Sequence, residues 1–168
     1  MRKFISLFVL ISFTLSVSAQ KDATEYNDII IDEQTKIGEK IVNFSNAQTN
    51  EDMDLALKIL EKQVGVSIET LNNLGGWNGD KDFLNSAHTL FNFYKEIASS
   101  DYRKMLDILI HEELTEEDVE KLNIIAADIS AREKAFDDDF AIKQEEFAKR
   151  NGFTLAPVEL QETIDEDY

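Results

Sequence analysis

Apolar residues recur at intervals of three and four along most of the chain, which is the spacing of helices that bury one face. The first stretch predicts a helix from near Thr24 to near Ser45, and Gln34 occupies one position of its apolar stripe. The other stripe positions are Tyr26, Ile30, Ile37, Ile41 and Phe44. A second stripe, from Met53 to Leu74, predicts a helix that ends at the glycine pair 75–76, where left-handed backbone costs little.

The third stripe predicts a helix that begins near Asp80 or Lys81 and runs to about Leu109. A polar interruption at residues 99–101 is expected to kink it. The loop before this helix, residues 75–80, carries Trp77, which we expect to cover one end of the core rather than to form a binding loop.

The fourth predicted helix has signals at both ends. Thr115 is placed to cap its first turn, with Asp118 three residues later completing the pattern of a capping box. The helix should end at Asn151, where Gly152 supplies a left-handed cap and Phe153 packs back on Phe147. Its stripe is Val119, Leu122, Ala126, Ile129, Phe136, Phe140 and Phe147.

We therefore predict an all-α protein, an up-down-up-down four-helix bundle with longer third and fourth helices. Residues 20–153 form the bundle in this interpretation, between a signal peptide at 1–19 and an acidic tail at 154–168. Gln34 in the first stripe and Gln144 in the fourth stand at the same spacing from their apolar neighbours. Stripes of the same period coincide in this way, so the match does not indicate a duplication.

The first residues predict export. Arg2 and Lys3 precede an apolar run that ends near Val17, and the small residues Ser18 and Ala19 follow, as in a secretory signal peptide. Several serines and a threonine interrupt the run, which makes it less suited to a membrane anchor. We expect cleavage after Ala19, a mature chain that is not inserted in a membrane, and a location in the periplasm, at the cell surface or outside the cell.

Composition narrows the functions further. The formal net charge of −17 disfavours nucleic acid and anionic membrane surfaces as partners, while it keeps an exported protein soluble. The chain has no cysteine, which excludes disulfides, thiolate catalysis and zinc-thiolate sites.

Several segments resemble small exported all-helical proteins of unknown function found in Bacteroidetes. These segments are the signal peptide, "GWNGDKDF" at 76–83, "LFNFYK" at 90–95 and "FAKRNGFTL" at 147–155. The motifs are packing and capping motifs, so the resemblance implies a helical fold and export but no activity.

The sequence offers no catalytic, metal or cofactor site. Di-metal sites in helical bundles use a Glu-x-x-His spacing, but Asn85 and Ile108 stand three residues before His88 and His111. Neither histidine is placed for haem or for a hydrolytic triad. Weak calcium association of surface carboxylates stays open. We expect a protein that is not an enzyme and uses no cofactor.

The hairpin at about residues 104–126 is the predicted partner contact. Counted from the loop at 75–80, it should project beyond the first two helices with more apolar residues than two helices cover. The predicted contact residues are Met105, Ile108, Leu109, Leu122 and Ile124. A protein partner or a second copy of the chain would cover them, unless the hairpin folds back onto the bundle.

A polar layer gives the alternative function. Gln34, Gln63 and Tyr94 should lie at similar heights within the core. Buried amides need partners, so the layer either fixes the register of the helices or lines a pocket for a small polar ligand between them. The sequence therefore predicts a non-enzymatic binding or structural module, with the hairpin contact first and a ligand pocket second.

Overall fold

The computed structural model describes the backbone of residues 3–111 and 113–155, and the side chains from residue 22 onward. Its helices are α1 (Lys3–Ser45), α2 (Asn50–Leu74), α3 (Asp82–Glu96), the π-helical segment η1 (Ile97–Asp101), α4 (Tyr102–Leu109) and α5 (Glu116–Asn151). Since α3, η1 and α4 follow one another without a break, the described residues form four helices, and the predicted all-α class is confirmed. No strand occurs in the described residues.

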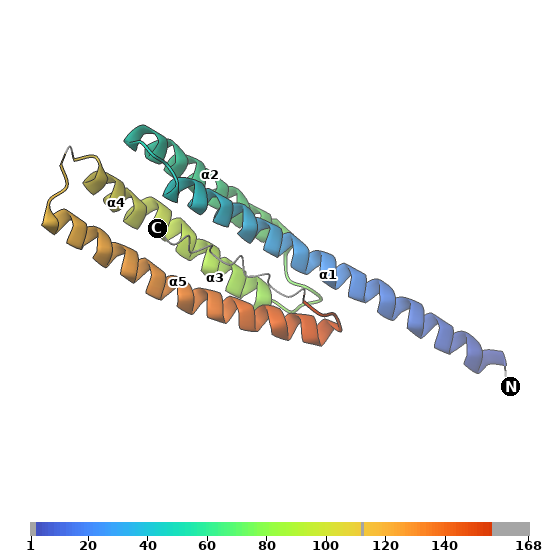
Figure 1. The fold of residues 1–168 in the computed structure, drawn as a ribbon. Coiled ribbons are helices and arrows are strands. Elements are labelled where there is room, and N and C mark those ends of the chain that lie inside the picture. Colours follow the sequence, from blue (N-terminus) through green and yellow to red (C-terminus); the bar gives the residue numbers. More distant parts are fainter. Residues whose placement is uncertain (1–2, 112, 156–168) are drawn as a thin grey trace, which may run out of the picture.

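The helices lie side by side (Figure 1). α1 packs on α2, α2 on α3, and α3 on α5, while the contact between α1 and α5 is slighter. α4 lies against both α2 and α5. In the part of the chain with described side chains, no helix has the length and hydropathy needed to cross a membrane.

The first helix begins earlier than the sequence pattern suggests. α1 starts at Lys3 rather than near Thr24. No glycine or proline stands between these positions, so nothing interrupts the backbone hydrogen bonds of a helix. Its end at Ser45 agrees with the prediction.

The core is formed by the apolar stripes of all four helices. α1 contributes Ile30 and Ile37, and α3 contributes Phe83 and Phe91, all fully buried or nearly so. α2 contributes Leu57, Leu60, Val64 and Leu71. Each buried side chain of this size stabilises the fold by about 1.5–3 kcal/mol relative to the exposed state. The core is therefore the main source of stability in a chain without disulfides.

α5 departs from its predicted stripe. Ile129, Phe140 and Phe147 are buried as expected, but Val119 and Ala126 are exposed and Leu122 is only half-buried. The first turns of α5 belong to the hairpin with α4, at the end of the molecule where few elements surround them (Figure 1). In these first turns, the apolar stripe of α5 is not covered by another helix.

The predicted helix ends are confirmed. Thr115 Oγ1 accepts a hydrogen bond from the Asp118 backbone N–H, and the Asp118 carboxylate accepts one from the Thr115 N–H, each at 3.1 Å. At the other end of α5, Gly152 has the left-handed φ of 73°, and the Phe153 ring packs on Phe147 at 5.9 Å between centroids.

The expected kink in the third helix is a π-helical turn. The Tyr102 N–H donates to the carbonyl of Ile97, five residues earlier, so one extra residue is accommodated without a break. The Ser99 hydroxyl donates to the Lys95 carbonyl at 2.8 Å, and such bonds loosen the regular helix pattern.

The loop between α2 and α3 packs on the end of the core. Trp77 Nε1 donates to Asn151 Oδ1 at 2.9 Å, and its ring lies 5.4 Å from that of Tyr26. The Tyr26 hydroxyl donates to the Gly75 carbonyl at 2.7 Å, and Gly75 has a φ of 69° that favours glycine. Trp77 is thus a packing residue.

Candidate ligand-binding site

A groove of about 600 Å³ lies between α1 and α5 and reaches the segment that follows α5. It forms where the contact between these helices is slight. Its lining residues on α1 are Thr24, Asn27, Asp28, Ile31 and Gln34. On α5 and beyond they are Asp137, Phe140, Ala141, Gln144, Phe153, Thr154 and Leu155. The volume falls within the range of small-molecule sites in proteins.

An amide pair crosses the groove and joins its two helices. Gln144 Nε2 on α5 donates to Asn27 Oδ1 on α1 at 2.9 Å. Asn27 Nδ2 in turn donates to Asp28 Oδ1 at 3.2 Å. The Asn27 side chain is 6% exposed, so the pair is held in place by burial as well as by hydrogen bonds.

A phenol and a carboxylate form the second polar group of the groove. The Tyr94 hydroxyl on α3 donates to Asp137 Oδ1 at 3.4 Å, and Gln34 hydrogen-bonds to the same hydroxyl. Burial raises the pKa of Tyr94, and the charges of Asp137 and Glu133 add to the shift. The phenol therefore stays protonated, and it links α1 to α5 through α3.

Two carboxyl groups of α5 are ionised with difficulty. Burial raises the pKa of Glu133, and the charge of Asp137 one turn away adds to the shift. Burial also raises the pKa of Asp137, in opposition to the hydrogen bond from Tyr94, and the charge of Asp138 adds to the rise. Among the described residues, no Lys, Arg or His forms a salt bridge with Glu133 or Asp137. Negative charge at this wall of the groove is left without a cation.

Apart from Thr24 and Thr154, the rest of the lining is apolar. Phe140 is 3% exposed and packs on Phe83, with 5.3 Å between ring centroids. Ile31, Phe153 and Leu155 are half-buried at the groove. The site thus combines a polar region of amides and carboxyls with an apolar surface, which is the usual make-up of a small-molecule site.

The predicted polar layer is divided between two groups of side chains. Gln34 and Tyr94 meet at the groove, but Gln63 donates to Ser67 Oγ at 3.0 Å on α2. The Ser67 hydroxyl donates to Glu33 Oε2 at 2.7 Å, and Lys36 Nζ lies 2.6 Å from Glu33 Oε1. Gln63 has its partner one turn along its own helix, so its hydrogen bonds are separate from those of Gln34 and Tyr94.

Glu33 is a buried carboxylate whose hydrogen bonds are satisfied. Burial opposes its ionisation, but hydrogen bonds from Lys36 and Ser67 and the Lys36 charge outweigh burial and lower its pKa. This second group lies between α1 and α2 and secures their packing. The sequence did not single out Glu33. It stands next to Gln34, beside the apolar stripe, where a polar residue is expected to face solvent.

The hairpin residues predicted as a partner contact face in different directions. Met105 packs against the core, and Ile108, Leu109 and Leu122 are half-buried. Ile124 is 62% exposed. Three apolar side chains of the hairpin outside the predicted contact residues are exposed as well: Ile110, Leu114 and Val119. The exposed apolar surface is therefore smaller than predicted and lies partly on other residues.

The two histidines lie outside the groove lining. His88 is half-buried, and burial lowers its pKa. His111 is exposed at the end of α4, with Nδ1 3.5 Å from Asp118 Oδ2. Among the described side chains, no group of three or more His, Cys, Asp or Glu is placed to hold a metal ion.

Comparison of the chain with family models, with curated proteins and with solved structures found no match. The groove and the hairpin therefore have to be interpreted from their own geometry.

Proposed function

We propose that the chain is a non-enzymatic, exported helical-bundle module that captures a small ligand in the groove between α1 and α5. The frame is an up-down-up-down four-helix bundle with longer third and fourth helices. The observation that supports this function is a groove of about 600 Å³ that combines a partly buried amide pair with an apolar surface. Sites of this size and make-up bind small molecules.

The lining chemistry suits binding rather than catalysis. The groove presents amides, carboxyls and a protonated phenol, which orient a ligand by hydrogen bonds. A hydrolytic site would need a nucleophile next to a base, and neither His88 nor His111 is among the lining residues.

The test is to fill the groove. Ala141 is exposed and lines the groove, so Ala141→Trp should occupy it, whereas Ala127→Trp makes the same change at an exposed site elsewhere on α5. Binding is followed by the NMR signals of the Asn27 and Gln144 side-chain amides during titration with phenethylamine, 2-phenylethanol and 3-phenylpropionate. At least one probe should shift both signals in the native protein and in Ala127→Trp, but not in Ala141→Trp. If all three leave both amides unchanged, the proposed function is wrong.

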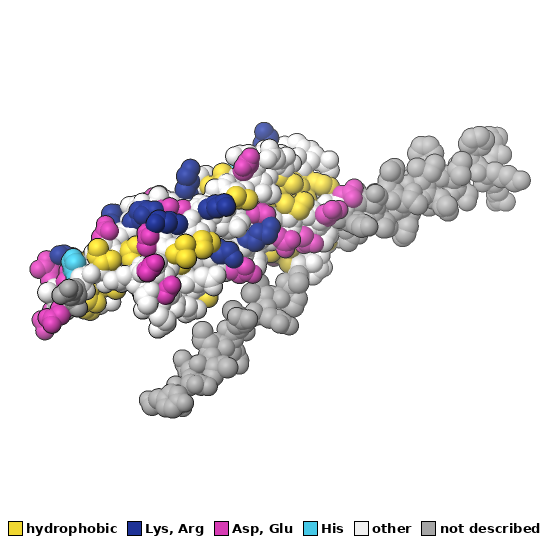
Figure 2. All heavy atoms as spheres, turned by 90° about the horizontal axis from the view of Figure 1, so that it is seen from above, with side chains coloured by type: hydrophobic (Ala, Val, Ile, Leu, Met, Phe, Trp, Pro, Cys, Tyr) yellow, Lys and Arg dark blue, Asp and Glu magenta, His cyan; other side chains and the backbone are white. Residues whose placement is uncertain are grey.

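Contact through the hairpin at about 104–126 is the second candidate function. Figure 2 shows hydrophobic side chains among acidic ones at that end of the molecule, and Ile110, Leu114, Val119 and Ile124 are exposed there. A protein partner or a second copy would cover them. Light scattering tests the second copy: a dimer that Ile124→Asp converts to a monomer, while Ile142→Asp on the exposed surface of α5 does not, would support it. A native monomer that binds no hydrophobic dye contradicts this candidate.

A further inference from the structure

We propose that the groove between α1 and α5 takes an organic cation, a protonated amine attached to an apolar group. The inference rests on the proposed function and names the chemical class of its ligand. It is carried by the arrangement of acidic, amide and apolar side chains around one cavity.

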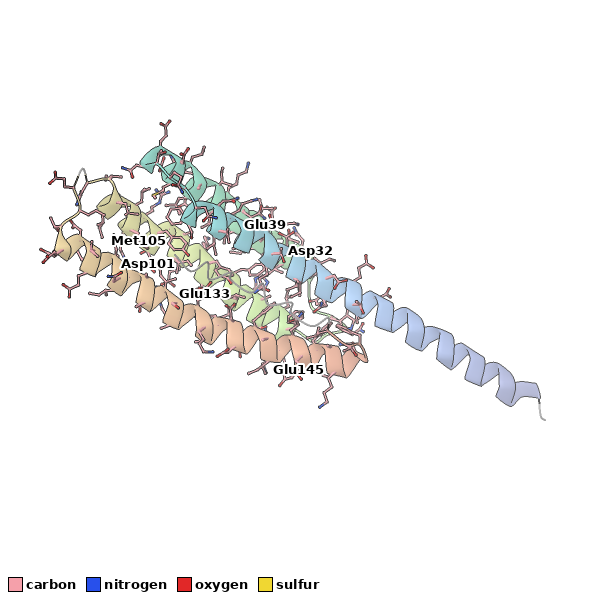
Figure 3. The ribbon with its side chains drawn as sticks, in the orientation of Figure 1. Asp32, Glu39, Asp101, Met105, Glu133 and Glu145 are labelled. Atoms are coloured by element: carbon pink, nitrogen blue, oxygen red, sulfur yellow. The ribbon has the colours of Figure 1, made fainter. Side chains whose placement is uncertain are left out.

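Carboxyl groups stand on both walls of the groove. Asp28 lies on α1 and Asp137 on α5, and both line the cavity. Glu133 lies one turn before Asp137 on α5, outside the lining, and Asp32 and Glu39 on α1 are outside it as well (Figure 3). A ligand in the groove is therefore exposed to negative charge from both helices, which favours a cation and disfavours an anion.

Basic residues near this wall have other partners. Lys143 pairs with Glu146 at 3.1 Å, and Lys134 pairs with Asp138 at 3.0 Å. Arg132 bridges to Asp101 on η1 at 2.5 Å. No Lys or Arg is among the described residues that line the groove. The carboxyl groups of the groove therefore lack a cation from the protein.

An ammonium group matches these side chains. It has three hydrogen-bond donors and no acceptor, and the carboxylate oxygens of Asp28 and Asp137 accept. Binding of a cation also favours the ionised form of the half-buried Asp137, whose charge is otherwise stabilised only by the Tyr94 hydroxyl. A neutral ligand of the same shape forms no such charge-assisted hydrogen bonds and does not stabilise the ionised form of Asp137.

The apolar part of the ligand has its own surface. Ile31, Phe140, Phe153 and Leu155 lie on the same cavity as the carboxyl groups. An amine with an aromatic or alkyl group thus uses both regions of the groove, whereas a bare metal ion uses only one.

The chain's own residues 156–168 are a poorer match. They follow Leu155, which lines the groove, but they carry Glu159, Glu162, Asp165, Glu166 and Asp167 and no Lys or Arg. Like charges on the segment and on the groove repel each other. The charges therefore favour a separate cationic ligand over this segment.

The test compares three probes of similar shape and different charge on the protein purified from an exporting host. Phenethylamine is a cation at pH 7.5, 2-phenylethanol is neutral, and 3-phenylpropionate is an anion. The amine should bind on the order of 10-fold more tightly than the alcohol, and the anion most weakly. Asp137→Asn should reduce the preference for the amine over the alcohol several-fold. The matched control, Asp139→Asn, removes one exposed carboxylate of the same helix and should change neither affinity.

The outcomes separate the two proposals. If the alcohol binds as tightly as the amine at the Asn27 and Gln144 amides, or if Asp137→Asn leaves the amine affinity unchanged, the inferred ligand class is wrong while the binding function stands. If no probe binds, the proposed function and the inferred ligand class are both wrong. Amine binding that appears only after removal of residues 156–168 identifies that segment as the occupant and overturns the inference.

Discussion

At the scale of single residues, the environment gives the acidic groups of this protein opposite properties. Glu33 is buried, yet hydrogen bonds from Ser67 and Lys36 stabilise its ionised form. Glu133 and Asp137 are only half-buried, but burial acts against both charges, as does the charge of Asp137 on Glu133 and that of Asp138 on Asp137. The first group supports the fold, and the second holds charge at the groove at a cost in stability.

Glu133→Gln should therefore stabilise the protein. Because the folded-state pKa of Glu133 is raised, its ionised form costs stability at neutral pH, and the cost disappears as pH falls through the folded pKa toward the ordinary value. We expect Tm to rise by up to about 3 °C at pH 7, since solvent screens a half-exposed group. The gain should be lost near pH 4. A fall in Tm at pH 7 in a thermal scan would contradict this interpretation.

Glu33→Gln should have the opposite effect. The lowered pKa of Glu33 means that its stabilisation is present above the ordinary pKa and is lost as pH falls through the folded value. We expect urea unfolding at pH 7 to show a loss of about 1.5–3 kcal/mol, as for hydrogen bonds to a charged group. Asp32→Asn, at an exposed neighbouring position, is the control and should change the stability little. Equal effects of both variants would show that the buried hydrogen bonds are not the cause.

At the scale of helices, local sequence signals predicted much of the structure. The cap at Thr115, the end at Gly152 and the irregular turn at 97–101 all lie where the residues indicate, because each depends on neighbours within a few positions. The exposure of the first turns of α5 was not predictable in this way. An apolar stripe shows which side of a helix is apolar, but it does not show what covers that side.

Thr115→Ala tests the contribution of one helix end. The variant removes the hydroxyl that accepts the Asp118 N–H, and it should lower the free energy of unfolding by about 1 kcal/mol. Thr115→Ser keeps the acceptor and should retain most of the stability. Urea denaturation of both variants measures the difference, and equal losses would show that the capping hydroxyl is not responsible.

At the scale of the whole molecule, the groove depends on the distance between α1 and α5. The sequence of neither helix alone determines that distance. The sequence signals were the polar layer that included Gln34 and Tyr94, and the shared place of Gln34 and Gln144 in two apolar stripes. Both glutamines line the groove. Asn27, Asp28 and Asp137 gave no signal, since polar residues beside a stripe usually face solvent. The hairpin differs from the expectation for a related reason: α4 lies against α2 and α5, so Met105 packs against the core.

Export can be tested on the same scale. Ala23 is the first residue of the described core and is fully buried, so cleavage after Ala19 leaves the described core intact. We expect mass spectrometry of the exported protein to give a chain that begins at Gln20. A mass that retains residues 1–19 would contradict the predicted signal peptide.

The position of a bound probe tests the central claim most directly. In isotope-filtered NMR spectra of the protein with phenethylamine, we predict nuclear Overhauser contacts from the probe ring to Ile31 and Phe140 in the groove. Contacts to the hairpin residues Leu122 and Ile124 instead would contradict ligand capture between α1 and α5.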